Sequence, residues 1–578
     1  MALFEFFELL VLSLLTLAAT AHPGSNKRCK FIPGDAGWPS RKDWQQLNRT
    51  VHGRLIATAP LGQVCHNKGH FAAYNEAACE ELRTDITQSG PQILEAEPGD
   101  ILNPYYQSLT CSPFAPADDA CELGERAVHS IDVRKAEDVQ AGFEFARRKK
   151  VRVVVKNTGI DYMGKSTGQG SLALWTWNLK TIEIIPSYNS ISYSGPAIKL
   201  GPGVIAGEAY AAAAAAGYRF VGPECGLVGV AGGYAQGGGH SQLSTAYGLA
   251  ADQVLEWEVV TAKGEHVVAT PQNNTDLYWA LSGGGGGTYG VVLSMTAKAY
   301  REGRVAGGLL VFSNTNETAY WQALEIWFHQ TPSLVQGTKN NVQFAFTKDM
   351  FLGFSLTLPD QNTSAIDTLL ARFLKDLTRL NITYQTSTFE SSSYAEHYVT
   401  SYGPLPYGNT CPTYVSLASR LIPRAVVRNQ KDNAKLLQVY ESIVADANFT
   451  VGCSVLDVAN VPPHPPNAVL PAWRDAIAYC NPQHAWDWAD PASSAAAKER
   501  LVGRHLPALE AATRGSGVYL NEMDPLYRGD WKASMYGANY DRLLSIKRAN
   551  DPARLMYARF AVGSDDFAFD EDGRLCSV

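Results

Sequence analysis

Two glycine-rich segments carry the residue types best suited to binding a charged cofactor. They are KNTGIDYMGKSTG (Lys156–Gly168) and CGLVGVAGGYAQGGGHS (Cys225–Ser241). Glycine lets the backbone approach a ligand closely because no Cβ stands in the way, and backbone N–H groups in tight turns neutralise the doubly charged pyrophosphate of a dinucleotide. Neither segment has the G-x-G-x-x-G spacing of a nicotinamide-binding turn. The two segments therefore predict a cradle for a flavin dinucleotide.

The order of the motifs resembles a known family. The segments GGYAQGGGH, YGLAADQVLEWEVVTAKG and LYWALSGGGGGTYGVV follow, in this order, the residues Gly159, Asp161, Tyr162, Gly164 and Ser166. This pattern is similar to the berberine-bridge-enzyme-like branch of the FAD-linked oxidases over about residues 122–303, and the similarity resumes near the C-terminus. The resemblance implies FAD as the cofactor, with contacts at Lys156, Asn157, Thr158, Gly159, Ile160, Asp161, Gly164, Ser166, Cys225, Gly229, Gly232, Gly233, Gly238, Gly239, His240, Leu249, Asp252, Val254, Gly290, Val292 and Asn539.

One position departs from the family pattern. Where the family has a histidine that bonds covalently to the flavin, this chain has Ile160. Isoleucine cannot form that bond, so the resemblance implies a less firmly anchored flavin with a lower reduction potential. Cys225 lies close to the family's second attachment point, and it is either a cysteinyl link, a buried thiol or half of a disulfide.

The resemblance also implies a catalytic pair, Tyr519 and Asn521, in the motif Tyr519-Leu520-Asn521. Flavin accepts a hydride while a base removes a proton from the substrate, and a tyrosine acts as that base only if neighbouring groups lower its pKa. Glu522 adds a carboxylate, and a buried core role is the alternative for Tyr519. His240 is expected to be structural or to contact the flavin edge. Nothing in residues 304–510 identifies a base on the second domain.

No metal site is predicted. Cys65, His66 and His70 have ligand-like spacing, but a closed zinc site needs four ligands, and cysteine in a secreted chain is more often half of a disulfide. Cleavage after Ala21 would expose His22, which on its own is weak evidence for a copper site.

Composition and targeting signals limit the class of protein. The chain has 578 residues, 46% hydrophobic residues, 18% charged residues and a net charge of −7, and it contains no sustained run of Lys or Arg. These values favour a multidomain globular protein with a small-molecule substrate, and they argue against nucleic acid or an anionic membrane as a partner. The family resemblance implies O2 as a further reactant. We expect a monomer.

Several features predict the secretory route. Residues 9–21 form an apolar segment too short to span a bilayer and end in Ala19-Thr20-Ala21, so residues 1–21 are predicted to be a signal peptide. The ten cysteines should mostly pair, and five of them lie between Cys29 and Cys121. Glycosylation is predicted at the six sequons Asn48, Asn273, Asn316, Asn362, Asn381 and Asn448.

Periodicity predicts two structural domains. Residues 128–133, 136–148 and 151–156 have a β–α–β pattern, residues 207–216 a helix stopped by Gly217, and residues 251–270 a hairpin about Lys263-Gly264. Together with the resemblance this implies an α+β, two-domain PCMH-type (vanillyl-alcohol-oxidase-like) FAD-binding fold, with an antiparallel-sheet substrate domain capped by helices. The predicted segments after residue 21 are a disulfide-containing segment (22–121), the FAD-binding domain (122–303), the substrate domain (304–510) and a C-terminal segment that returns to the FAD domain (511–578).

The function expected from these features is FAD-dependent oxidation of a small organic molecule. A secondary-metabolite intermediate is favoured over a carbohydrate, because sugar oxidases of this kind typically use both flavin links. The alternative is a cyclase or an inactive binding relative in which FAD is structural.

Overall fold

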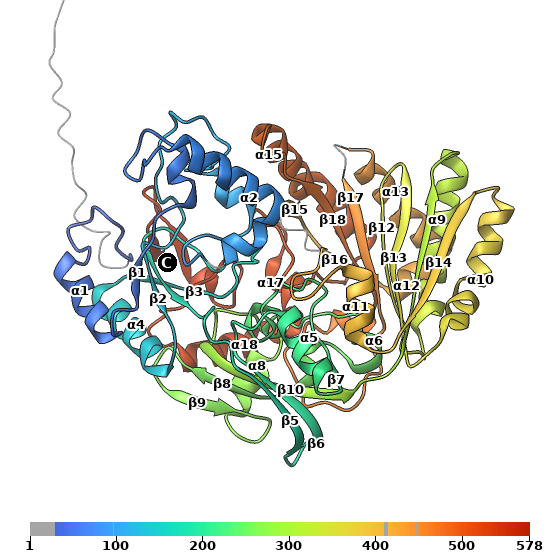
Figure 1. The fold of residues 1–578 in the computed structure, drawn as a ribbon, viewed down its shortest axis with the longest axis horizontal. Helices are drawn as coiled ribbons and strands as arrows, with labels where there is room; N and C mark the ends of the chain where they lie inside the picture. The colour runs from blue at the N-terminus through green and yellow to red at the C-terminus, as the bar shows by residue number, and fades with distance from the viewer. Residues whose placement is uncertain (1–28, 96, 410–413, 447–448) are drawn as a thin grey trace, which may run out of the picture.

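The computed structural model describes residues 29–95, 97–409, 414–446 and 449–578. Figure 1 shows the N-terminal half of the chain gathered on one side of the molecule, the middle of the chain on the other, and the C-terminal segment running back among the N-terminal elements. The predicted signal peptide lies outside the described residues. Within the described part, no helix is both long and apolar enough to cross a membrane.

The first sheet confirms the predicted β–α–β opening. Strand β2 (His129–Asp132) leads through α4 (Ala136–Lys149) to β3 (Arg152–Lys156), and β4 (Ser171–Trp175) lies between the two strands and parallel to both. Strand β1 (Leu55–Ala57) adds an antiparallel edge. Because β3 runs directly into Asn157, this sheet fixes the starting point of the first glycine-rich turn.

A second sheet supports the second glycine-rich segment. Its order is β5-β6-β10-β8-β9, with β7 also paired to β10. The predicted hairpin is confirmed, since Val260 pairs with His266 across the Lys263-Gly264 turn. Helix α5 (Ala206–Ala215) ends before Gly217, whose φ of +79° suits glycine. The strands are β5 (Ile182–Asn189), β6 (Ser194–Leu200), β7 (Tyr218–Phe220), β8 (Val254–Val260), β9 (His266–Ala269) and β10 (Val291–Arg301).

The third sheet has eight strands, and all its pairings are antiparallel, as predicted for the substrate domain. We call it the roof sheet. Helices cover one face of it (Figure 1). Its strands are β11 (Val305–Ser313), β12 (Asn341–Phe346), β13 (Met350–Pro359), β14 (Tyr384–Ser391), β15 (Val415–Leu417), β16 (Arg420–Pro423), β17 (Thr450–Val455) and β18 (Ala476–Ala485).

Helical periodicity explains why these helices pack on the roof sheet. In α10 (Thr363–Arg379) the buried residues recur three or four positions apart, which places them on one face: Ile366, Leu370, Phe373 and Leu377. Helix α9 (Glu317–Val335) packs beside α10, and α13 (Gln430–Val444) packs against α9; they contribute Trp327 and Tyr440 to the core. These helices cover the outer face of the roof sheet, and the inner face lines the cavity described below.

The C-terminal segment packs against the FAD-binding region. Helix α18 (Tyr540–Asn550) contacts α8 (Thr275–Leu281), Met556 bridges to Val153, and Cys576 forms a disulfide with Cys29. The last two strands, β19 (Phe567–Phe569) and β20 (Leu575–Ser577), form a hairpin. Strands β2 to β10 lie in the range predicted for the FAD-binding domain and β11 to β18 in that of the substrate domain, whereas β1 joins the first sheet from the predicted N-terminal segment. The domain limits stay predictions.

The remaining helices are short connectors apart from α1 and α2. They are α1 (Arg41–Thr50), α2 (Glu76–Glu95), α3 (Pro104–Ser108), α6 (Ser244–Tyr247), α7 (Ala250–Gln253), α11 (Tyr394–Tyr402), α12 (Arg424–Arg428), α14 (Ala472–Asp475), α15 (Pro491–Arg500), α16 (Leu506–Ala512) and α17 (Trp531–Met535).

The N-terminal cysteines are used for disulfides. Cys65 pairs with Cys79 and Cys111 with Cys121. His66 is buried, and both of its ring nitrogens hydrogen-bond backbone carbonyls. The residues with ligand-like spacing around His66 therefore lie in a segment that disulfides cross-link.

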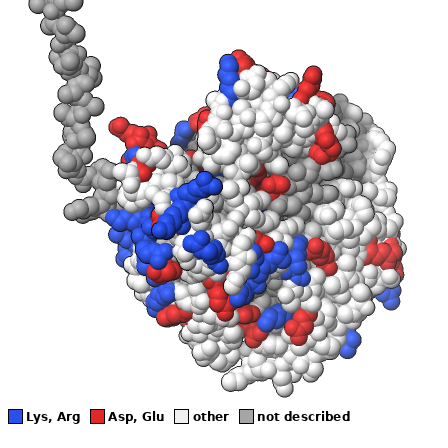
Figure 2. Space-filling view, turned by 60° about the vertical axis from the view of Figure 1, so that its left-hand side comes forward, with Lys and Arg blue, Asp and Glu red and all other residues white. Residues whose placement is uncertain are grey.

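Five predicted glycosylation sites lie among the described residues. The side chains of Asn273, Asn316, Asn362 and Asn381 are exposed, and Asn48 is half-buried. Asn448 lies outside the described residues. Figure 2 shows basic and acidic side chains mixed over one face of the molecule, with a denser group of basic side chains on one side.

Candidate functional site

A cavity of about 550 Å³ lies between the glycine-rich turns and the roof sheet. Its volume falls in the range of small-molecule and cofactor sites, roughly 300–1,000 Å³. The predicted residues that line it are Asn157, Thr158, Gly159, Ile160, Asp161, Ser166, Cys225, Gly229, Gly232, Gly233, His240, Gly290, Val292, Tyr519 and Asn521. The fold therefore brings together residues from both glycine-rich segments and the C-terminal motif.

Asp161 shapes the first turn. Its carboxylate accepts hydrogen bonds from the Ser166 backbone at 2.7 Å, the Ser166 hydroxyl at 2.6 Å and the Met163 backbone at 3.0 Å. Gly159 has a φ of +79°, and a Cβ there would lie 3.1 Å from the buried Lys156 side chain. The turn is therefore held open toward the cavity by its own side chains.

The second glycine segment packs tightly on the first. It contains a π-helical turn, Val230–Tyr234. A Cβ on Gly229 would lie 2.1 Å from Asn157 Nδ2, and one on Gly232 would lie 2.5 Å from the same atom. Asn157 Nδ2 in turn donates to the Pro202 carbonyl at 2.5 Å. Glycine is required at these two positions because the backbone of the second segment packs directly against the Asn157 side chain of the first.

Other glycines face open space. A Cβ on Gly233 or Gly287 would meet no atom within 4 Å, and both residues line the cavity. A third glycine-rich segment, Ser282–Gly290, contacts the second one here, because a Cβ on Gly286 would lie 3.1 Å from the Gly233 Cα. The buried Asn157 Oδ1 has no hydrogen-bond partner among the described residues. An open glycine cradle with an unsatisfied polar atom fits a dinucleotide such as FAD.

Eight predicted cofactor residues lie behind this wall instead of lining it: Lys156, Gly164, Gly238, Gly239, Leu249, Asp252, Val254 and Asn539. Asp252 illustrates their place. It is 1% exposed and accepts hydrogen bonds from Arg474 at 2.7 and 2.9 Å and from Asn467 at 2.6 Å. Asn539 donates to the Ala468 and Val469 carbonyls. Among the described residues, the named partners of Asp252 and Asn539 do not line the cavity either.

The two candidate attachment positions line the cavity, but neither offers a free nucleophile. Ile160 has only an alkyl side chain, and Cys225 is disulfide-bonded. Of the three roles open to Cys225, the structure shows the disulfide. A sulfur engaged in a disulfide has no thiolate with which to bond flavin.

Tyr519 and Asn521, the predicted catalytic pair, both line the cavity and contact each other. Asn521 Nδ2 donates to the Tyr519 hydroxyl at 2.9 Å and to the Tyr234 carbonyl at 3.2 Å. A Cβ on Gly237 would collide with the Asn521 amide, so this glycine makes room for the pair. Burial raises the pKa of Tyr519. The phenol is therefore neutral at ordinary pH, and the lowered pKa that a tyrosine base requires is not found.

Sequence reasoning missed the charged cluster around His240. The imidazole Nδ1 lies 3.2 Å from Glu224 Oε1, and Nε2 lies 3.8 Å from Glu522 Oε1. Burial alone would lower the pKa of His240, but the charges of Glu224 and Glu522 raise it to about 10. His240 is therefore an imidazolium at neutral pH, beyond the structural role expected from its place after three glycines.

The inner face of the roof sheet was also missed. On β12, β13 and β18 the lining residues are two residues apart, which is the strand periodicity that could have flagged them, whereas β17 lines the cavity with three consecutive residues. The cavity-lining residues are Gln343 and Ala345 on β12, Leu352 and Phe354 on β13, Gly452, Cys453 and Ser454 on β17, and Tyr479, Asn481 and Gln483 on β18. Alternate residues such as Phe344 on β12 and Ala478 on β18 belong to the hydrophobic core.

Lys165 is a further lining residue that the predicted set omitted. Burial lowers its pKa to about 8, and the nearby Asp161 carboxylate partly opposes the shift. The protonated side chain of Lys165 adds positive charge to the cavity wall at the first turn.

Comparison with known proteins agrees with the geometry. A model described as "FAD binding domain" matches residues 129–270, and one described as "Berberine and berberine like" matches residues 518–562. The chain is 47% identical over 574 residues to the bifunctional decalin synthase calF of Penicillium decumbens, an alignment that covers 99% of each protein. It is 44% identical over 575 residues to the VAO-type flavoprotein oxidase VAO615 of Thermothelomyces thermophilus, covering 98% of this chain and 99% of the relative.

The fold is shared with a solved structure. The crystal structure of the VAO-type flavoprotein MtVAO615 from Myceliophthora thermophila C1 matches with a TM-score of 0.91 at 44% identity, covering 95% of this chain and 100% of the other. Full-length similarity, both family segments and the glycine cradle lead to one conclusion: the chain belongs to the berberine-bridge-enzyme-like family of FAD-linked oxidoreductases with the two-domain VAO-type fold.

Proposed function

We propose that this FAD-linked oxidoreductase oxidises a secondary-metabolite intermediate that carries an O–H or N–H group. The observation that supports this most directly is a single cavity with the glycine cradle on one side and the amide and aromatic side chains of the roof sheet on the other. When bound, FAD accepts a hydride from the substrate. Tyr519 and Asn521 stay our proposed catalytic pair, with the neutral phenol and the amide orienting the substrate.

The residues of the chain hold the cofactor and exclude water. The backbone at Gly159, Gly233 and Gly287 would receive the dinucleotide, and the amide oxygen of Asn157 would accept a hydrogen bond from it. The roof sheet closes the other side of the cavity. Closure of this kind strengthens the electrostatic interactions inside because it removes the competing solvent.

A secondary metabolite is a better substrate than a sugar on two grounds. Ile160 removes the attachment expected of sugar oxidases of this kind, and Leu352 and Phe354 give the roof an apolar patch. The relative calF is called a decalin synthase, and VAO615 is called an oxidase. We therefore propose that O2 reoxidises the flavin, and we retain carbohydrate oxidation as the lesser alternative.

A second candidate is cyclisation with FAD as a structural group. The observation that favours it is the full-length identity of 47% to a bifunctional decalin synthase. In that case the cavity walls would fold the substrate for ring closure without net electron transfer. An inactive binding relative is the third reading of the same fold.

Spectroscopy distinguishes these candidates. The purified protein should show the oxidised-flavin spectrum, and anaerobic addition of polyketide, alkaloid and oligosaccharide candidates should bleach it if one of them is oxidised. Product formation with the flavin still yellow would indicate the cyclase. A colourless, folded protein would contradict both.

We also propose secretion and a monomeric state. Four disulfides join described residues, and four sequons are exposed, as expected for an oxidising compartment. Intact mass before and after deglycosylation, together with light scattering, checks both proposals.

A further inference from the structure

One charged cluster lies in the cavity at the end of the second glycine-rich segment. His240 lies between Glu224 and Glu522, and all three line the cavity. The imidazole is 7% exposed, and its Nδ1 makes no aligned hydrogen bond within the described residues although Glu224 Oε1 lies at 3.2 Å. The cluster therefore faces whatever small molecule the cavity holds.

The other ionisable groups of the cavity are unsuited to accept a proton from that molecule. Burial raises the pKa of four phenols that line the cavity, so they are neutral: Tyr162, Tyr234, Tyr402 and Tyr519. The Tyr479 hydroxyl accepts a hydrogen bond from Asn481, and His240 is already protonated. Asp161 is occupied by three hydrogen bonds within its own turn. Lys165 is a cation below its pKa of about 8. Two carboxylates, Glu224 and Glu522, are left.

The two carboxylates differ in how they are held. Glu224 accepts a hydrogen bond from the Gln343 amide, whose oxygen accepts one from the Tyr402 hydroxyl, so it is fixed to the roof sheet. Glu522 Oε2 accepts from Asn481 Nδ2 at 3.1 Å, while Oε1 lies 3.8 Å from the imidazolium. Because a carboxylate offers about four lone-pair sites, Glu522 keeps acceptor capacity toward the cavity.

The surroundings of Glu522 suit a base. The charged groups that face it are His240 and Glu224, and its other ionisable neighbours are the phenols of Tyr162, Tyr479 and Tyr519. Burial raises the pKa of Glu522, and the His240 imidazolium opposes the rise. A carboxylate whose pKa is raised toward neutral pH is an effective proton acceptor near the working pH.

We propose that Glu522 is the catalytic residue that accepts the substrate's O–H or N–H proton, and that His240 is the positioning residue that holds its carboxylate. The inference rests on the proposed oxidation. In that step the substrate C–H bond breaks and its electron pair leaves as hydride to bound FAD. The O–H or N–H bond also breaks, a lone pair of that atom closes the C=O or C=N bond, and the proton passes to a Glu522 oxygen.

The cluster also narrows the substrate class. Two carboxylates around one imidazolium leave a net negative charge near the reacting group, which disfavours an anion there. The reacting end of the substrate is therefore a neutral alcohol or an amine and not a carboxylate.

The test compares Glu522→Gln with the matched variant Glu224→Gln on the compound that bleaches the wild-type flavin. Stopped-flow reduction is followed anaerobically across pH, and Kd is measured from the perturbation of the flavin spectrum. Glu522→Gln should slow reduction by about 100-fold or more, with little change in Kd, and should abolish the fall in rate at acid pH. Glu224→Gln should keep that acid limb.

His240→Gln supplies the positioning readout. Removal of the imidazolium should move the acid limb to higher pH, because the positive charge beside Glu522 favours its ionised form. A merely structural role for His240 would leave the limb in place.

The outcomes separate the two proposals. If Glu522→Gln reduces its flavin within about tenfold of the wild-type rate and keeps the acid limb, the assignment of Glu522 is wrong while the oxidation stands. If no compound bleaches the wild-type flavin, the proposed function itself fails. If Glu522→Gln does not retain FAD, Glu522→Asp replaces it in the test, because aspartate keeps the carboxylate. The rate of flavin reduction in Glu522→Asp must still fall at acid pH. If this fall is absent, the proposal is overturned.

Discussion

At the residue scale, Ile160 is the most informative departure from the family pattern. It lines the cavity directly after Gly159, where the resemblance implies a flavin-bonding histidine. We expect Ile160→His to form that bond and to make the reduction potential more positive. Acid-precipitated variant should stay yellow, whereas wild type and Ile160→Val should release their colour to the supernatant. Colour in the supernatant of Ile160→His would show that the position alone does not suffice.

His240 gives a pH-dependent prediction. Its folded pKa of about 10 exceeds the ordinary 6.5, so its ion pairs contribute stability that is fully present below pH 6.5 and lost as pH rises through 10. The melting temperature of the wild type should therefore fall more steeply from pH 6.5 to 10 than that of His240→Gln. Differential scanning calorimetry across this window checks the slope, and parallel curves would contradict the raised pKa.

Sequence reasoning found the parts of the site that are adjacent in the chain. Tyr519 and Asn521 are two residues apart, and their hydrogen bond follows from one turn. The contact between Gln343 and Glu224 spans 119 residues and depends on how the roof sheet is placed over the cradle. His240 and Glu522 each belong to a segment that the sequence singled out, but no sequence pattern showed that the two side chains and Glu224 meet.

At the element scale, some glycines of the cradle are needed for cofactor binding and others for the stability of the fold. A Cβ on Gly233 would meet no protein atom within 4 Å and would project into the cavity. Gly233→Ala should therefore leave the melting temperature of the apoprotein unchanged and weaken FAD binding by about tenfold or more, equivalent to about 1.4 kcal/mol. Gly229→Ala should instead destabilise the apoprotein, because its Cβ would lie 2.1 Å from Asn157. FAD titration of both apoproteins tests the contrast.

Local patterns predicted the elements better than their pairing. The β2–α4–β3 unit and the β8–β9 hairpin join neighbours in the chain, and both are confirmed. The roof sheet pairs β12 with β17 across about a hundred residues, an order set by tertiary packing and not by strand periodicity.

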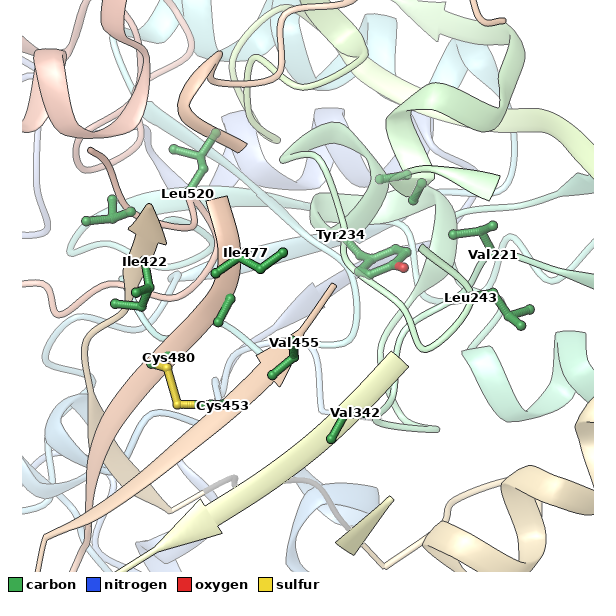
Figure 3. Packing of buried hydrophobic residues seen from close by; sticks show 14 of the residues in the cluster. Val221, Tyr234, Leu243, Val342, Ile422, Cys453, Val455, Ile477, Cys480 and Leu520 are labelled. Carbon is green, nitrogen blue, oxygen red and sulfur yellow. A yellow bond between two sulfur atoms is a disulfide. The ribbon is translucent and has the colours of Figure 1, made fainter. Parts of the chain in front are cut away.

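The disulfide between β17 and β18 should stabilise the roof sheet. Cys453 and Cys480 are paired directly across the two strands, and Figure 3 shows their bond beside the packed apolar side chains. For a sequence separation of 27 residues, loss of the bond should lower the free energy of unfolding by about 3.5 kcal/mol. The Cys453→Ala/Cys480→Ala protein should also bind substrate less tightly, because Cys453 lines the cavity, whereas removing the Cys65–Cys79 bond should not. Equal effects of the two double variants on binding would count against a role of the roof sheet in the site.

At the scale of the whole molecule, the cavity joins the two halves of the chain. Its walls come from residues 155–292 on one side and from β12, β13, β17 and β18 on the other. Since Ile160 and Cys225 offer no free nucleophile, we expect FAD to bind reversibly and to stabilise the native state by mass action. Free FAD at 100 times Kd should raise the unfolding free energy by about 2.7 kcal/mol. Calorimetry with increasing FAD should show one transition that moves to higher temperature, because the cofactor holds both halves together. A transition that ignores added FAD would indicate a covalent link, and two transitions with only the first moving would show that the halves unfold separately.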